Sequence, residues 1–194
     1  VGGVLRVVVT MHSTFLINSL CHYMGSRPYS NTQTARDNWV TALLTCGEGY
    51  HNYHHQFALD YRNGVRYFQF DPTKWFIFAL SKVGLTNDLK RIDASKILAY
   101  RLKTEEERLK QRFAHDNTFL TQKVEPLKTN IAHLLAKISE LELELVALKK
   151  VKVDYVKERY HTYKELLGIH VSSLKSARKE LAHTLTYWRS LAKV

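Results

Sequence analysis

Three kinds of residue are scarce in this 194-residue chain, which has two cysteines, three prolines and eight glycines. Cys21 and Cys46 are too few for a disulfide framework, so nothing argues for an oxidising compartment. The low glycine and proline content excludes a collagen-like or proline-rich linker protein. The chain begins at Val1 without a basic flank and cleavage site, so we predict no signal peptide and expect a piece of a longer protein.

Positive charge is in excess, with 29 Lys and Arg against 18 Asp and Glu and a formal net charge of +11. The excess is spread over both halves of the chain, and its basic runs contain few interleaved aromatic residues. A nucleic-acid-binding surface concentrates its positive charge, so we predict no nucleic-acid partner. Anionic lipid or an acidic protein remain as partners for such a surface.

One apolar run, Val4–Met24, is long enough to cross the hydrocarbon core of a bilayer as a helix. It also carries Arg6, His12, Asn18 and His22. One alternative is a buried helix of a soluble domain, in which these groups are hydrogen-bonded. The other is a membrane helix whose polar residues face a protein interior, where ionisable groups are functional candidates.

Capping signals predict further helices downstream. We expect a helix over Ala35–Cys46 with Thr34 as its N-cap. Asp71–Leu85 begins with Asp-Pro, the usual order of an N-cap and first helical residue, and its apolar character suits a helix at a membrane interface. Asn87–Arg112 is predicted to be a polar and mostly helical continuation.

Three histidines fall within five residues in the segment H-N-Y-H-H. If Tyr50–Gln56 is helical, His51, His54 and His55 stand at positions i, i+3 and i+4, which places their imidazoles on one helix face. A single buried histidine is usually a hydrogen-bonded core residue. Three on one face cost desolvation unless something binds them, so we predict that they bind a metal ion.

Asn18 and His22 add an amide and a fourth imidazole, at i and i+4 of the apolar run. Neutral imidazoles suit Fe, Zn, Cu or Ni. A zinc ribbon is unsupported because the cysteines lack C-x-x-C spacing, and a metalloprotease would need H-E-x-x-H. Glu48 has two interpretations, as a carboxylate that orients a metal-binding imidazole or as an ordinary loop residue.

The segments N-S-L-C-H-Y-M-G-S-R-P-Y (18–29) and G-E-G-Y-H-N-Y-H-H-Q-F-A-L-D-Y-R-N-G (47–64) resemble the C-terminal catalytic part of membrane acyl-CoA Δ9 (stearoyl-CoA) desaturases. The segment D-P-T-K-W-F-I-F-A-L-S-K-V-G-L (71–85) is similar to their bacterial branch, and the whole resemblance covers about residues 4–102. Ala58 stands where the family usually has proline. This difference loosens the turn after the histidines but affects none of the implied ligands. The first two histidine boxes of the family are absent from this chain.

The resemblance implies a metal site and its ligands. The residues that it implies as iron ligands are His22, His51, His54 and His55, with Asn18 contacting a metal through water. It implies two iron ions, and O₂ as a co-substrate, at a site on the cytoplasmic side of an integral membrane protein.

The same resemblance implies the reaction and the partners. The reaction is the introduction of a cis double bond, Δ9, into a saturated chain carried by CoA, another acyl carrier or a lipid. The electron donor would be a separate protein, of cytochrome b5 or ferredoxin type, because the chain has no H-P-G-G haem box. Basic residues that could dock an acidic donor, or lie next to anionic lipid, are Arg62, Arg66, Lys90 and Arg91. With half of the ligands missing, we expect the fragment to be inactive alone.

The last third of the chain carries a heptad repeat instead of site residues. Its apolar positions are Val124, Leu127, Ile131, Leu134, Ile138, Leu141, Leu145 and Leu148, with a break at Lys152. A second apolar series runs from Leu174 to Leu191. Two arrangements fit, a helical hairpin that turns near Gly168 and a parallel dimer that self-associates through residues 124–148.

The sequence therefore predicts an all-α protein. Residues 1–102 would form a membrane helix with a cytosolic helical metal-binding cap, the C-terminal part of a desaturase catalytic domain. Residues 103–194 would form an amphipathic helical extension, either a coiled coil or a hairpin. Two other functions remain open, a membrane di-iron hydroxylase on the same scaffold and a membrane-anchored coiled-coil adaptor in which the histidines are incidental.

Overall fold

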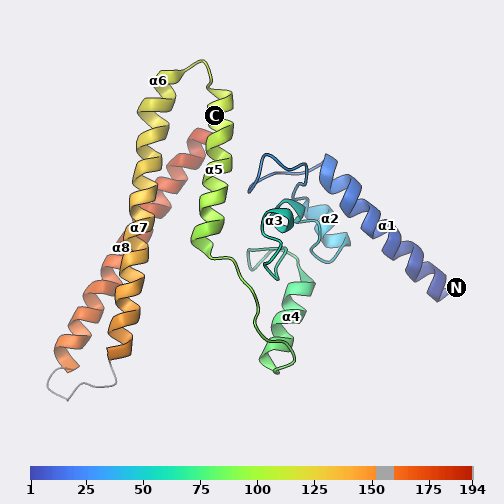
Figure 1. The fold of residues 1–194 in the computed structure, drawn as a ribbon, viewed down its shortest axis with the longest axis horizontal. Coiled ribbons are helices and arrows are strands. Elements are labelled where there is room, and N and C mark those ends of the chain that lie inside the picture. Colours follow the sequence, from blue (N-terminus) through green and yellow to red (C-terminus); the bar gives the residue numbers. More distant parts are fainter. Residues whose placement is uncertain (152–159, 194) are drawn as a thin grey trace. The chain divides into compact units, whose positions relative to one another are not determined.

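The computed structural model describes residues 1–151 and 160–193, and the elements in these ranges are helices joined by loops. Isolated β-bridges link Ser26 with Asp37 and Asp37 with Tyr50, and no longer strand occurs in the described ranges. The predicted all-α fold class is confirmed. The chain divides into two compact units, Val1–Glu107 and Arg108–Val194 (Figure 1). The functional boundary expected at residue 102 stays a prediction.

Helix α1, Gly2–Tyr23, opens the first unit and corresponds to the predicted apolar helix. Among the described helices it is the one long and apolar enough to cross a membrane, and only 6% of its most apolar window is buried. Its branched side chains are exposed in the first half and half-buried at Leu16, Ile17 and Leu20, and Cys21 is the helix residue that the fold buries. This exposure favours the membrane helix over the helix buried in a soluble domain.

Helix α2, Trp39–Leu44, is shorter than predicted. The expected start at Ala35 with Thr34 as N-cap is wrong, because Asn38 caps the helix by accepting the N–H groups of Val40 and Thr41 at 3.0 and 3.1 Å. The residues before it run extended, as the bridge at Asp37 shows.

Helix α3 spans His51–Gln56 and agrees with the predicted helix of the H-N-Y-H-H segment. Tyr50 stands at its N-cap position without a side-chain hydrogen bond. Helix α4, Pro72–Lys82, is capped as expected by Asp71, whose carboxylate accepts the N–H of Lys74 at 2.9 Å. The Lys74 side chain does not point into solvent. It is buried, and its ammonium group donates to three loop carbonyls, those of Gly64, Arg66 and Gln69.

Helix α5, Ala94–Arg112, begins later than the predicted Asn87. Residues 87–93 are a non-helical segment that is attached to the loop after α3, because the Ile92 N–H donates to the Asp60 carboxylate at 2.9 Å. Ile97 then packs into a small core with three buried aromatic residues, Tyr29, Tyr53 and Phe57. This core lies directly against α3, since Tyr53 belongs to that helix.

The second unit is built from long helices. A short α6, Asn117–Phe119, passes through a π-helical turn, Leu120–Val124, into α7, Glu125–Val151. Pro126 explains the turn, because proline has no N–H to continue the α-helical ladder. The Glu125 N–H bonds instead to the Leu120 carbonyl, and the helix stays continuous.

Helix α8, Tyr160–Lys193, packs against α7 (Figure 1). The pairs Glu142–Arg178 (2.7 Å) and Glu144–His170 (3.1 Å) run in opposite sequence directions, so the helices are antiparallel. Gly168 lies inside α8, so the predicted turn near Gly168 is wrong. The predicted break at Lys152 lies outside the described residues.

The heptad positions of α7 form its packed face. Val124, Ile131, Leu134 and Leu145 are buried, and the intervening heptad leucines and isoleucine are half-buried. Leu174, Ala177 and Trp188 of α8 are buried as well. Of the two arrangements predicted from the sequence, the structure has the hairpin, in which the heptad face packs within one chain.

Candidate metal centre

The end of α1 supplies the first imidazole. His22 lies in the last turn of α1, and its Nδ1 is 2.8 Å from the hydroxyl of Thr34. That hydrogen bond holds the ring by one nitrogen and leaves Nε2 for another partner. Thr34, predicted as a helix cap, thus supports His22 instead.

The other imidazoles come from α3, whose six residues are too few to form a stable helix alone. Asp37 takes the role of its cap, because its Oδ1 accepts the N–H groups of Asn52 and Tyr53 at 2.8 and 3.1 Å. Burial raises the pKa of Asp37 to about 7, against the opposing effect of these two hydrogen bonds.

Asn52, the second residue of H-N-Y-H-H, fixes α3 against the loop that follows α1. Its fully buried amide accepts the Tyr29 N–H at 2.9 Å and donates to the carbonyls of Ser30 and Ala35 at 3.1 and 2.9 Å. All three hydrogen bonds of this side chain therefore go to the loop after α1. The distance between α3 and the end of α1 depends on this amide.

Three imidazoles converge as a result. His22, His51 and His55 each offer a ring nitrogen, and these atoms lie within 4.8 Å of one another. The Nε2 atoms of His51 and His55 are 3.0 Å apart, and the ring centroid of His22 lies 5.0 and 5.7 Å from theirs. Figure 1 shows α1 and α3 as the two elements that contribute them.

The surroundings of His51 and His55 favour the neutral form of these two rings. Burial, followed by the neighbouring imidazoles His55, His22 and His54, lowers the pKa of His51 to about 4. Burial and the charges of His54 and His22 also lower the pKa of His55. Neutral imidazole is the form that ligates metals.

An unsatisfied atom adds to the chemical fit of the site to a metal ion. The Nδ1 of His51 is buried and has no hydrogen-bond partner among the described residues. Buried polar atoms are normally hydrogen-bonded, so such an exception calls for a partner. An all-imidazole donor set suits iron and other transition metals.

His54 lies next to these three rings, and its Nδ1 is directed towards Asn63. Its ring centroid is 6.1 Å from that of His51, with the rings nearly parallel, and 6.0 Å from that of His55. Its Nδ1 lies 3.2 Å from Oδ1 of Asn63. Asn18 lies one turn before His22, and its amide nitrogen donates to the Thr14 carbonyl at 3.1 Å. Its role as a ligand through water stays a prediction.

Two residues near the imidazoles, Asn63 and Asp71, were not predicted to belong to the site. Asn63 contacts His54, and Asp71 receives the N–H groups of Asn63 and Gly64 at 2.9 Å. The sequence offered a weak signal in the R-N-G turn that follows the histidine segment. Nothing in the pattern indicated that this turn folds back onto His54.

The predicted basic residues have different surroundings. Arg62 forms an ion pair with the buried Asp60 at 2.7 Å, and this bond raises the pKa of Arg62. Arg62 therefore ties the loop to Asp60, and its part in a docking surface stays a prediction. Arg66, Lys90 and Arg91 are exposed, although Arg91 also donates to the Tyr61 hydroxyl at 2.8 Å.

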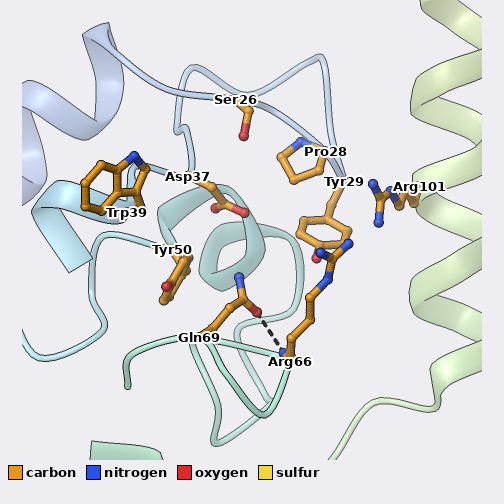
Figure 2. A pocket seen from close by; sticks show the side chains of 9 residues that line it. All are labelled: Ser26, Pro28, Tyr29, Asp37, Trp39, Tyr50, Arg66, Gln69 and Arg101. Atoms are coloured by element: carbon orange, nitrogen blue, oxygen red, sulfur yellow. Dashed lines mark hydrogen bonds between the residues drawn. The ribbon is translucent and has the colours of Figure 1, made fainter. Parts of the chain in front are cut away.

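A separate cavity of about 240 Å³ lies beside α3 in the first unit. Figure 2 shows the guanidinium groups of Arg66 and Arg101 on the same side of it as Tyr29, with Asp37 across from them. The full lining consists of Ser26, Pro28, Tyr29, Asp37, Trp39, Tyr50, Arg66, Gln69 and Arg101. None of the clustered histidines lines this cavity.

Comparison with known proteins shows what the first part of the chain is similar to. The sequence model of the fatty acid desaturases matches residues 2–83. The chain is 45% identical over 116 residues to acyl-CoA desaturase 1 of Saccharomyces cerevisiae, an alignment that covers 60% of this chain and 23% of that protein. It is 50% identical over 96 residues to a probable acyl-CoA desaturase of Schizosaccharomyces pombe, covering 50% and 20%.

Stearoyl-CoA desaturase 5 of Bos taurus is 38% identical over 103 residues, covering 53% of this chain and 31% of that protein. The chain thus spans about a fifth to a third of the length of these relatives. The particular likeness to the bacterial branch is not confirmed. The resemblance to the fatty acid desaturases, predicted from the histidine pattern, is confirmed over residues 2–83.

Proposed function

We propose that this chain is part of a membrane fatty acyl desaturase that introduces a cis double bond, at the Δ9 position, into a saturated acyl chain. The observation that carries the proposal is the convergence of imidazoles from α1 and α3. These imidazoles lie within the residues that match the desaturase family. The reaction consumes O₂, two electrons and two protons, and it releases two molecules of water.

The proposed cofactor is a pair of iron ions, as the family resemblance implies. His22, His51 and His55 would hold one ion together, with His54 and, through water, Asn18 completing the contribution of this chain. When bound, iron would supply the O₂-dependent oxidation of an unactivated methylene pair, which no side chain performs. The Thr34 hydroxyl on His22 and the Asp37 carboxylate at the start of α3 would hold these donors in place.

The ligand set of this chain is incomplete under this proposal. It supplies four imidazoles, and the family resemblance requires two further histidine boxes from elsewhere. The 194 residues alone are therefore inactive towards acyl-CoA. The partners are the rest of the catalytic domain, an acyl chain on CoA or another carrier, and a separate electron donor of cytochrome b5 or ferredoxin type.

The proposed location is a membrane, with the metal site on the cytoplasmic side. Helix α1 would cross the bilayer, and its C-terminal end leads into the cap with Arg27 and Arg36 close behind. Lysine and arginine near a membrane helix favour the cytoplasmic side. The same excess of positive charge would attract anionic lipid or an acidic donor.

Product analysis of the full-length protein that contains this segment tests the proposal. With acyl-CoA, O₂, a reductant and an electron donor, we expect a cis double bond at C9. His51→Ala should abolish its formation, whereas His115→Ala, at an exposed histidine outside the cluster, should leave the rate unchanged. A hydroxylated product would favour the hydroxylase, and normal desaturation by His51→Ala would refute the site.

A further inference from the structure

Asn63 bridges a carboxylate and a clustered imidazole. Its amide nitrogen donates to Oε1 of Glu48 at 2.8 Å, and its amide oxygen lies 3.2 Å from Nδ1 of His54. The backbone N–H of Asn63 donates to Asp71 at 2.9 Å, so the main chain holds this residue independently of its side chain. Glu48, Asn63 and His54 therefore form a chain of two hydrogen bonds.

The chemistry of the three groups gives this chain a direction. An ionised carboxylate accepts hydrogen bonds and donates none, so Glu48 requires the NH₂ end of the Asn63 amide. The amide oxygen must then face His54, and an oxygen can only accept. Nδ1 of a neutral His54 therefore carries the ring proton, and the lone pair lies on Nε2.

We propose that Asn63, oriented by Glu48, is a positioning residue that fixes the tautomer and the direction of the His54 ring, so that Nε2 is presented to a metal ion. This inference rests on the metal-binding role of His54 in the proposed function. It gives Glu48 its orienting role, through Asn63 rather than by direct contact. A hydrogen bond at the second ring nitrogen orients a ligand and raises its basicity.

The other supports in the cluster do not fix a tautomer in this way. The Thr34 hydroxyl beside His22 can donate or accept. His51 and His55 share one contact between their Nε2 atoms, which either ring can protonate. Within the described residues, His54 alone among these rings is tied to a carboxylate through an amide.

The first test reads the tautomer of His54. Nitrogen-15 NMR of the 194-residue chain in detergent, labelled at histidine and assigned with His54→Ala, should show a protonated Nδ1 in the metal-free protein. Asn63→Leu should abolish that preference. The double variant Glu48→Gln with Asn63→Asp should restore it, because the new amide donates to the new carboxylate, which accepts from Nδ1. Asn63→Asp alone should recover less, since two carboxylates then face each other.

The second test measures metal affinity on the same samples with Co²⁺, whose absorption reports imidazole ligation. Asn63→Leu should weaken binding by about tenfold or more, and the double variant should recover most of it. Asn87→Leu, the same change at an exposed asparagine, is the control and should leave affinity and thermal melting unchanged.

Three outcomes would overturn the proposal. They are a protonated Nε2 in the wild-type protein, an unchanged tautomer in Asn63→Leu, and an unchanged Co²⁺ affinity in Asn63→Leu. The proposed function fails separately. If the tautomer and affinity results hold while the full-length protein makes no double bond, the positioning role stands and the desaturase assignment falls.

Discussion

The two units of this chain are stabilised in different ways. Val1–Glu107 buries nine polar or charged residues among its described positions, whereas Arg108–Val194 buries one, Thr184. In the first unit, helices of six residues are held by side-chain hydrogen bonds to loops. In the second, two long helices bury apolar heptad positions against each other. The first unit should therefore respond sharply to single polar substitutions, and the hairpin to charge in its apolar face.

The largest effect is expected in the hairpin. Replacing Leu134 and Leu141 by Asp removes apolar burial and places charges that must be desolvated, at a cost of roughly 4 kcal/mol or more. Circular dichroism should show a loss of helix equivalent to α7 and α8, while Co²⁺ binding by the first unit persists. Retained helicity would show that the heptad face does not hold the hairpin.

The next effect is expected at Asn52. Asn52→Leu leaves the Tyr29 N–H and the carbonyls of Ser30 and Ala35 without their partner, at about 1–3 kcal/mol for each buried group. Thermal melting should fall and metal affinity should drop together, because α3 loses its attachment to the loop after α1. If Asn52→Leu and Asn87→Leu have the same melting temperature, the stability of the first unit does not depend on this amide.

The pH dependence of stability gives a smaller effect. The pKa of Asp37 rises from 3.8 to about 7 on folding, so the folded state binds more protons between these values. Its stabilising contribution is complete below about pH 4 and is lost as the pH rises through about 7. As the pH rises from about 4 to about 7, the unfolding free energy of the wild type should therefore fall relative to that of Asp37→Asn. A constant difference from pH 4 to 8 would contradict the raised pKa.

The smallest effect is expected at the surface of the hairpin. Arg178 and Glu142 form an exposed ion pair at 2.7 Å, and such pairs contribute about 1 kcal/mol or less. Arg178→Ala should shift the melting temperature by a few degrees at most, and the shift should vanish at high salt. A large loss of stability would mean that the hairpin also relies on polar contacts.

The same contrast explains what the sequence could predict. The apolar run of α1, the Asp-Pro start of α4 and the heptads of α7 are local or periodic signals, and each was read correctly. The H-N-Y-H-H spacing placed three imidazoles on one short helix for the same reason.

Tertiary contacts account for what the sequence did not predict. The start of α2 depends on Asn38 rather than Thr34, which bonds to His22 far away in the chain. Nothing in the sequence indicated that loop carbonyls from residues 64–69 would surround the ammonium group of Lys74. Asn63 reaches His54 only because the R-N-G turn folds back. No periodicity or spacing encodes such returns of a loop onto a helix.

The π turn ahead of Pro126 has a further consequence for the second unit. A π turn accommodates one residue more than an α turn, and one residue corresponds to about 100° of rotation around a helix. Deleting one residue from Leu120–Val124 should therefore rotate α6 by about that angle relative to the heptad face of α7. The extra residue of this turn therefore sets the angular phase between the segment before it and the apolar heptads of α7.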